Sequence, residues 1–180
     1  MHLLILAYLV VLIIFLASYS PPRDYTVKFS NGNPPVIAWI NSPSSDATEK
    51  VRTVKLPDST YTIPPEMAGH FVLVYDWVLD LTTPTENSQI TIPSKFPTDF
   101  ASIPKALHSF ISPLTNKVYA SIVHDYLYRN PIDIKARALT KSQVDQIFYW
   151  GMRFRGVTRP TAGLMYWAVR LFGGSSYIRS

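Results

Sequence analysis

The chain has 180 residues, enough for about one domain, and 47% of them are hydrophobic while 16% are charged. This balance excludes a disordered chain, because such chains lack the apolar surface that folding requires. Cysteine is absent, which excludes disulfides and thiolate metal sites. Residues 1–100 carry a net charge of −3 and residues 101–180 a net charge of +8. The basic half indicates either an anionic phospholipid surface as partner or ordinary solvated helix faces.

Residues 1–20 are predicted to form a transmembrane anchor. Every residue from Leu3 to Ala17 is apolar, and a helix of this length just covers the hydrocarbon layer of a bilayer. A cleaved signal peptide is the alternative, but no Lys or Arg precedes the apolar run. We expect the chain in a host cell membrane or a virion membrane. Arg23 and Lys28 would keep the domain cytoplasmic, although two charges do not fix the side.

Residues 21–69 are predicted to form a β-rich extension. Short runs of β-branched and aromatic residues alternate with Pro, Gly, Asn and Ser, which is typical of strands joined by turns. The candidate strands, including two beyond the extension, are residues 25–29, 36–40, 51–56, 70–81 and 89–92. We expect them to form one small antiparallel sheet.

Residues 70–180 are predicted to form the main domain, and its second half reads as three packed helices. The first begins at Ser112-Pro113 and ends at Arg129. A capping box at Thr140 opens the second helix, which runs to about Arg155, and a third runs from Thr158 to Gly173-Gly174. A sheet followed by three helices predicts an α+β fold.

Polar residues on these helices are the candidates for a site. His124 and Asp125 lie side by side at the margin of an apolar helix face. Asp145 shares a core-facing stripe with Phe148, Tyr149 and Met152. A buried carboxylate is costly without a partner, and antiparallel packing of the helices would offer either His124 or Arg129.

These two partners lead to different interpretations. An Asp145–Arg129 ion pair would leave His124 as a satisfied core histidine. An Asp145–His124 pair would fix the histidine tautomer and stabilise its imidazolium, with Asp125 facing the same cleft. Such a group of side chains suits metal-assisted hydrolysis.

A Pro-punctuated loop, residues 92–104, can bring further polar groups to this cleft. Asp99 is its candidate ligand, with a turn-forming or capping role as the alternative. Ser102 is a weaker candidate, because nothing around it resembles a nucleophile elbow.

Three motifs resemble an uncharacterised family that is common in phages and prophages, domain of unknown function 1353. They are IPSKFPTDFASIP, HDYLYR and VDQIFYWGM, which occur in the family's order, and the resemblance covers roughly residues 70–174. It implies a viral or prophage context and no particular activity.

VHDYLYRN followed by SQVDQIFYWGM is also similar to the two catalytic helices of the secreted phospholipase A2 superfamily, especially its bacterial type. This resemblance implies that His124 is the general base for the attacking water and that Asp145 holds the histidine. It implies that Asp125 is a calcium ligand, and Tyr128 matches the tyrosine after the His-Asp pair. Asp99 and neighbouring carbonyls would complete the calcium shell. The chain differs in having no cysteine and no Gly-rich calcium loop.

We therefore expect a membrane-anchored, phage-associated, calcium-dependent esterase that acts on glycerophospholipids. Its expected partners are the bilayer and other virion or membrane proteins. One alternative is a non-catalytic membrane or virion component. Another is a zinc peptidase acting on cell wall, although His70 and His108 lie in no recognisable zinc spacing. No nucleic-acid partner is expected, because no basic patch with interleaved aromatic residues stands out.

Overall fold

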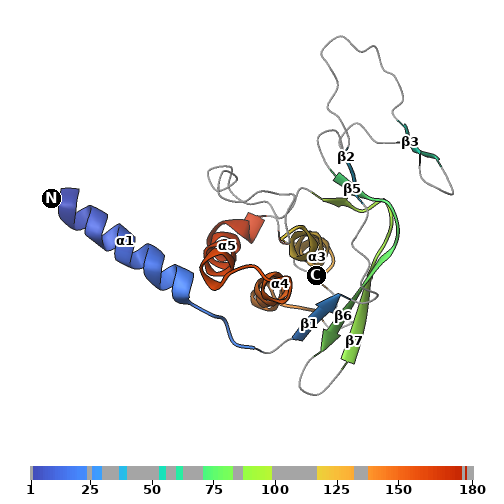
Figure 1. The fold of residues 1–180 in the computed structure, drawn as a ribbon. Helices are drawn as coiled ribbons and strands as arrows, with labels where there is room; N and C mark the ends of the chain where they lie inside the picture. Colours follow the sequence, from blue (N-terminus) through green and yellow to red (C-terminus); the bar gives the residue numbers. More distant parts are fainter. Residues whose placement is uncertain are drawn as a thin grey trace, which may run out of the picture.

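The computed structural model describes residues 2–23, 26–29, 37–39, 53–55, 60–62, 71–82, 87–98, 117–131, 138–175 and 177. Within these ranges the chain is an α+β protein, as expected (Figure 1). Its helices are α1 (His2–Ser18), α3 (Val118–Arg129), α4 (Lys141–Phe154), α5 (Arg159–Phe172) and the 3-10 helix η2 (Gly173–Ser175). Its strands are β1 (Thr26–Phe29), β2 (Ile37–Trp39), β3 (Thr53–Lys55), β4 (Thr60–Thr62), β5 (Phe71–Leu73), β6 (Trp77–Thr82), β7 (Asn87–Ile92) and β8 (Pro97–Thr98).

The strands pair antiparallel, as predicted, but the described ones form three small sheets rather than one. Their orders are β1-β6-β7, β2-β5-β8 and β3-β4. Strand β1 lies within the predicted extension and pairs with β6 of the main domain. Side chains of β6 alternate between buried and half-buried, which is the period expected when one face of a sheet covers the core.

The single strand predicted over residues 70–81 is divided into β5 and β6, which belong to different sheets. Two backbone amides of the segment between β7 and β8 donate hydrogen bonds here, one to the last residue of β5 and one to the residue before β6. The Lys95 amide donates to the Leu73 carbonyl at 2.7 Å, and the Ser94 amide donates to Asp76 Oδ1 at 2.7 Å. The division is therefore set by contacts with a distant segment, which the local hydrophobic pattern does not reveal.

Helices α3, α4 and α5 agree with the predicted boundaries wherever these are described. Helix α3 ends at Arg129, while its predicted start at residues 112–113 lies outside the described residues. Helix α4 follows a capping box in which the Thr140 side chain and Gln143 bond to each other's backbone. Helix α5 ends at Phe172, and the predicted Gly173 is its C-cap. Local capping signals thus fix these ends.

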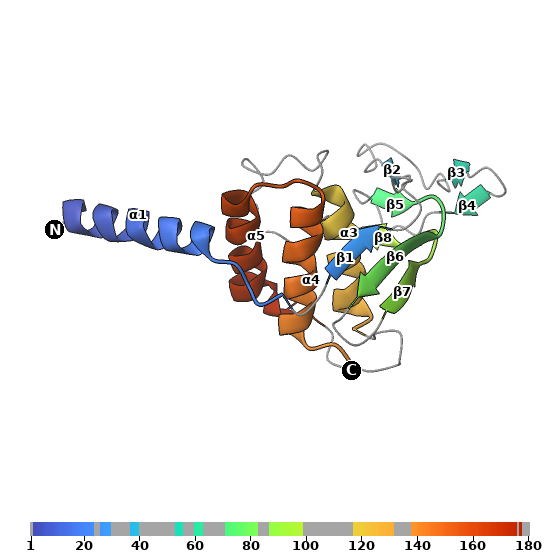
Figure 2. The ribbon, with the colours of Figure 1, turned by 60° about the horizontal axis from the view of Figure 1, so that its bottom comes forward.

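Two clusters of buried apolar side chains form the core, and the helices lie between the strands and α1 (Figure 2). The first cluster joins the β1-β6-β7 sheet to α3 and α4, through residues such as Leu79, Ile122 and Ile147. The second joins α4 to α5, through residues such as Phe148 and Met165. Helices α3 and α4 therefore contribute to both clusters, and polar groups between them are enclosed.

The transmembrane span predicted over residues 1–20 requires correction. Helix α1 covers 17 residues, and among the described residues no helix is long and apolar enough to cross a membrane. At about 1.5 Å per residue α1 is about 26 Å long, whereas the hydrocarbon layer is about 30 Å thick. Helix α1 leaves the body of the molecule at one end and contacts α5 (Figure 1).

Candidate functional site

Asp145 is the centre of a buried polar cluster between α3, α4 and α5. Its side chain is fully buried, and His124 is 2% exposed. Asp145 Oδ1 lies 3.3 Å from His124 Nε2 and accepts a hydrogen bond from the Tyr128 hydroxyl at 2.6 Å. His124 and Tyr128 are four residues apart and therefore neighbours on one face of α3. The antiparallel packing of α3 on α4 brings this face against the carboxylate.

The second oxygen of Asp145 binds two cations. Lys141 Nζ lies 3.0 Å from Oδ2, one helical turn earlier on α4, and Arg170 Nη1 of α5 lies 3.2 Å away. Lys141 also donates to the carbonyls of Val169 and Arg170 near the end of α5. Both carboxylate oxygens are thus bonded, which offsets the cost of burying the charge.

Arg129 is not the partner of Asp145. Its guanidinium donates to the Pro97 carbonyl at 3.0 Å and lies over the Phe96 ring, 5.3 Å from the ring centroid. Of the two pairings that the sequence allowed, the structure has the one between Asp145 and His124.

The His124 ring is held so that its two nitrogens have different surroundings. Its ring packs against Tyr128 and Phe148, with centroid distances of 3.8 Å and 4.7 Å. Nε2 faces Asp145. Nδ1 is buried and makes no hydrogen bond within the described part of the chain, and Asp125 Oδ1 lies 4.0 Å from it. Nδ1 is therefore the ring nitrogen that is not bonded to Asp145.

Asp125 joins α3 to β8. Its side chain is 5% exposed, and Oδ2 accepts a hydrogen bond from the Thr98 hydroxyl at 2.5 Å. Arg129 reaches the residue before Thr98, one turn further along α3. These two contacts hold β8 against α3.

The cluster changes the proton affinity of its members. Burial lowers the pKa of His124, but the neighbouring Asp125 and Asp145 carboxylates outweigh it and hold this pKa above its ordinary value of 6.5. Burial raises the pKa of Asp145, but the hydrogen bonds from His124 and Tyr128, the His124 charge and Lys141 hold it below 3.8. Burial and the Asp145 charge raise the pKa of the Tyr128 hydroxyl. The charged forms of His124 and Asp145 therefore stabilise each other.

A family model described as "Protein of unknown function (DUF1353)" matches residues 73–169, more than half of the chain. The chain belongs to this family. The match includes the whole of α3 and α4, so the His124–Asp145 pair lies inside the DUF1353 region. The family's description names no activity.

The chain is also similar to a curated protein, the "Uncharacterized protein y4jT" of Sinorhizobium fredii. It is 34% identical over 84 residues, which make up 46% of this chain and 23% of the relative. The match thus spans about a quarter of that protein's length. No solved structure matches the chain.

Two predicted site residues of this DUF1353 protein, Asp99 and Ser102, lie outside the described residues, as do His70 and His108, which were considered for a zinc site. Within the described ranges no three His, Cys, Asp or Glu side chains come together as a metal-binding group. Calcium takes six to eight oxygen ligands, whereas Asp125 Oδ2 already accepts the Thr98 proton. The described donors by themselves do not complete the oxygen shell of a calcium ion.

Three contributors to the cluster were missed from the sequence. Lys141 stands four residues before Asp145, a spacing that predicts an ion pair on a helix. Thr98 and Arg170 come from β8 and α5, at separations of 27 and 25 residues from their partners. No local signal connects these two to the site.

Proposed function

We propose that this DUF1353 chain is a hydrolase with a phospholipase A2-like site that acts on the esters of glycerophospholipids. The observation that carries the proposal is the asymmetry of His124, in which Asp145 binds Nε2 while Nδ1 has no hydrogen-bond partner in the described residues. A histidine whose one nitrogen is oriented by a carboxylate can use the other as a general base. Tyr128 strengthens this arrangement because it donates to the same carboxylate oxygen.

The proposed reaction uses Nδ1 to move one proton. Water attacks the ester carbonyl carbon and gives its proton to Nδ1, which makes His124 an imidazolium next to Asp145. When the tetrahedral intermediate collapses, the ester C–O bond breaks and the leaving alkoxide takes this proton. The products are a fatty acid and a lysophospholipid, and His124 returns to its neutral form. Asp145 keeps its charge throughout and stabilises the imidazolium.

We also propose that the reaction depends on calcium. The resemblance to phospholipase A2 helices assigns Asp125 and Asp99 as ligands, and Asp125 accepts a hydrogen bond from Thr98, the residue before Asp99. In the same way, the viral or prophage context is a prediction from the resemblance to phage proteins. Other virion or membrane proteins are proposed as partners on that ground.

The proposed location is a host cell or virion membrane. It is supported by α1, whose large apolar side chains from Ile5 to Phe15 are between 37% and 69% exposed. Exposed apolar surface of this extent is unfavourable in water and favourable in a bilayer. A substrate drawn from the bilayer is consistent with that location.

The proposal is tested by fatty-acid release from phospholipid vesicles with the full chain. We expect release with calcium, loss of release with a calcium chelator, and a fall of at least about 100-fold in His124→Ala. Chelation without effect would remove calcium from the proposal. Release that persists in His124→Ala would contradict the site.

A second candidate is a non-catalytic membrane or virion component, which the burial of the cluster favours. His124 and Asp145 are at most 2% exposed, and Asp145 is bonded by side chains from three helices. In that case His124→Ala should lower thermal stability, and wild-type protein should release no fatty acid. The two candidates therefore differ in the behaviour of the wild-type chain.

A further inference from the structure

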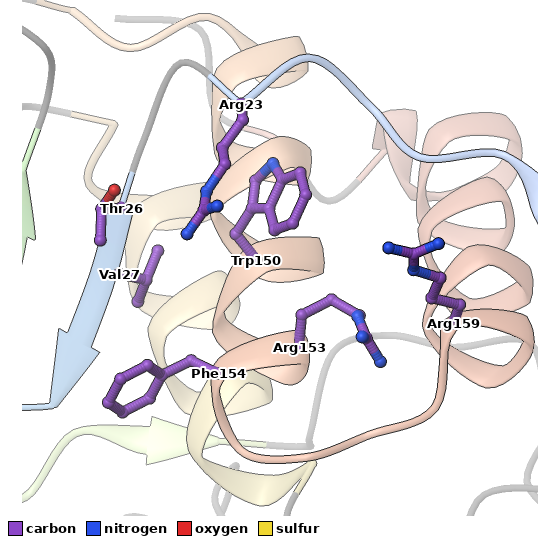
Figure 3. Close-up of a pocket in the computed structure, with 7 residues that line it drawn as sticks. All are labelled: Arg23, Thr26, Val27, Trp150, Arg153, Phe154 and Arg159. Carbon is purple, nitrogen blue, oxygen red and sulfur yellow. The ribbon is translucent and has the colours of Figure 1, made fainter.

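A hollow lined by three arginines lies where α1 meets the body of the molecule. Its volume is about 290 Å³, and Arg23, Arg153 and Arg159 come from the linker after α1, the last turn of α4 and the first turn of α5. Figure 3 shows these side chains around one space, together with Trp150 and Phe154. The described lining contains no carboxylate. Three positive charges without a neutralising acid in that lining favour an anionic ligand.

Two of the three arginines make aromatic or backbone contacts within the described part of the chain. The Arg23 guanidinium lies over the Trp150 ring, 5.2 Å from its centroid. Trp150 Nε1 in turn donates to the Pro22 carbonyl at 3.0 Å, which fixes the linker against α4. Arg153 donates to the Val157 carbonyl. The hollow is thus a formed structure, while Arg23 and Arg159 stay exposed to an incoming group.

The end of α1 is fixed beside this hollow. Gly163 of α5 packs so closely against it that an added Cβ would lie 2.8 Å from the carbonyl oxygens of Leu16 and Ala17. Just after α1, the Tyr19 ring packs against Tyr166 and Trp167, at centroid distances of 5.8 Å and 5.2 Å. An apolar helix, then a belt of Tyr and Trp, then arginines is the order expected from the hydrocarbon layer to the headgroups of a membrane.

We propose that the hollow formed by Arg23, Arg153 and Arg159 binds the phosphate of an anionic lipid headgroup while α1 lies in the apolar layer. The guanidinium groups supply hydrogen bonds to phosphate oxygens. A lipid is favoured over a free phosphate because α1 carries exposed apolar side chains and its last turn packs on α5, the helix that supplies Arg159. The inference rests on the proposed membrane location and not on the hydrolytic activity.

The test is binding of the full chain to vesicles, measured by co-sedimentation. Phosphatidylcholine vesicles are compared with vesicles that also contain phosphatidylglycerol. We expect wild type to prefer the anionic vesicles and the double variant Arg23→Gln/Arg159→Gln to bind them about 25-fold more weakly, about fivefold for each arginine. A thermal melt confirms that the variant is folded, which is expected because both side chains are exposed.

Lys95→Gln is a single-charge control, because Lys95 is exposed in the segment between β7 and β8. It should bind anionic vesicles as tightly as wild type, whereas Arg159→Gln alone should bind about fivefold more weakly. Equal binding by these two single variants would overturn the inference. Equal binding of wild type to both kinds of vesicle would also overturn it, and a response of the intrinsic tryptophan fluorescence to inorganic phosphate at constant ionic strength would then assign the hollow to a soluble anion.

The outcomes for the hydrolytic site are separate. Arg23→Gln/Arg159→Gln should retain hydrolysis of a soluble short-chain ester, because within the described residues neither arginine contacts the His124 cluster. Normal vesicle preference with no hydrolysis by wild type would contradict the proposed function and leave the headgroup site supported.

Discussion

The molecule contains two charged sites that are built in opposite ways. Around Asp145 a buried carboxylate is shared by His124, which is also buried, and by the partly exposed Lys141 and Arg170. Around the hollow at the end of α1 three arginines share one space whose described lining includes no acid. The first arrangement fixes a histidine inside the protein, and the second leaves positive charge available to a group from outside. We therefore expect substitutions around Asp145 to lower the stability of the fold and substitutions in the hollow to leave it nearly unchanged.

The largest effect is expected from Asp145→Ala. Removing the carboxylate leaves Lys141, Arg170 and His124 without their shared partner, and we expect the free energy of unfolding to fall by about 3–5 kcal/mol. Arg159→Gln removes one charge at the hollow and should change the free energy of unfolding by less than about 0.5 kcal/mol. Urea titrations of both variants make this comparison. Equal losses of unfolding free energy in the two variants would contradict the difference between the two sites.

The pH dependence of stability should reflect the same cluster. The pKa of Asp145 is held below 3.8, so its stabilisation is present above that pH and is lost as the pH falls through the lowered folded-state value. The pKa of His124 is held above 6.5, so its stabilisation is complete below that pH and is lost as the pH rises through the raised value. Thermal melts should therefore show greatest stability between pH 3.8 and 6.5 for this pair. A profile that does not change in Asp145→Ala would contradict this assignment.

Tyr128→Phe removes one hydrogen bond to the buried carboxylate. A bond to a charged group contributes about 1.5–3 kcal/mol, and we expect a loss of stability in that range. Tyr126→Phe on the same helix is the control, since the described residues offer its hydroxyl no hydrogen-bond partner and its ring packs edge-on against Phe96. Equal melting temperatures for the two variants would exclude Tyr128 from the cluster.

Gly163→Ala tests how α1 is attached. The new Cβ would lie 2.8 Å from two backbone oxygens of α1, so the helices must separate, at a cost of about 1–3 kcal/mol. We expect faster proteolysis between α1 and β1. Gly174→Ala is the control, because nothing lies within 4 Å of a Cβ at that position. Unchanged proteolysis in Gly163→Ala would contradict the close packing.

The helical half was predictable because its signals are local. The capping box at Thr140 and the stop at Gly173 fixed helix ends, and the apolar stripe around Asp145 indicated a buried carboxylate that needs a partner. Antiparallel packing of the two helices allowed either His124 or Arg129 as the partner of Asp145, and the sequence did not decide between them. The sequence also indicated that α1 is apolar, but it did not indicate that its last turn lies against Gly163.

The remaining features depend on contacts between distant segments. The division between β5 and β6 depends on Ser94 and Lys95, and the bonds of Asp125 and Asp145 to Thr98 and Arg170 join different elements. The arginine hollow could not be predicted from the spacing of residues in the sequence, because Arg23 is more than 100 residues away from Arg153 and Arg159. Such groups become neighbours only through the packing of α1, α4 and α5.

The most direct test of the account is fatty-acid release by wild type and by His124→Gln, with both proteins shown by thermal melts to be folded. Glutamine keeps a polar side chain next to Asp145 but cannot take a proton from water. The account predicts measurable release by wild type and a rate about 100-fold to 10,000-fold lower in the variant. Equal rates, or no release by folded wild-type protein, would contradict it.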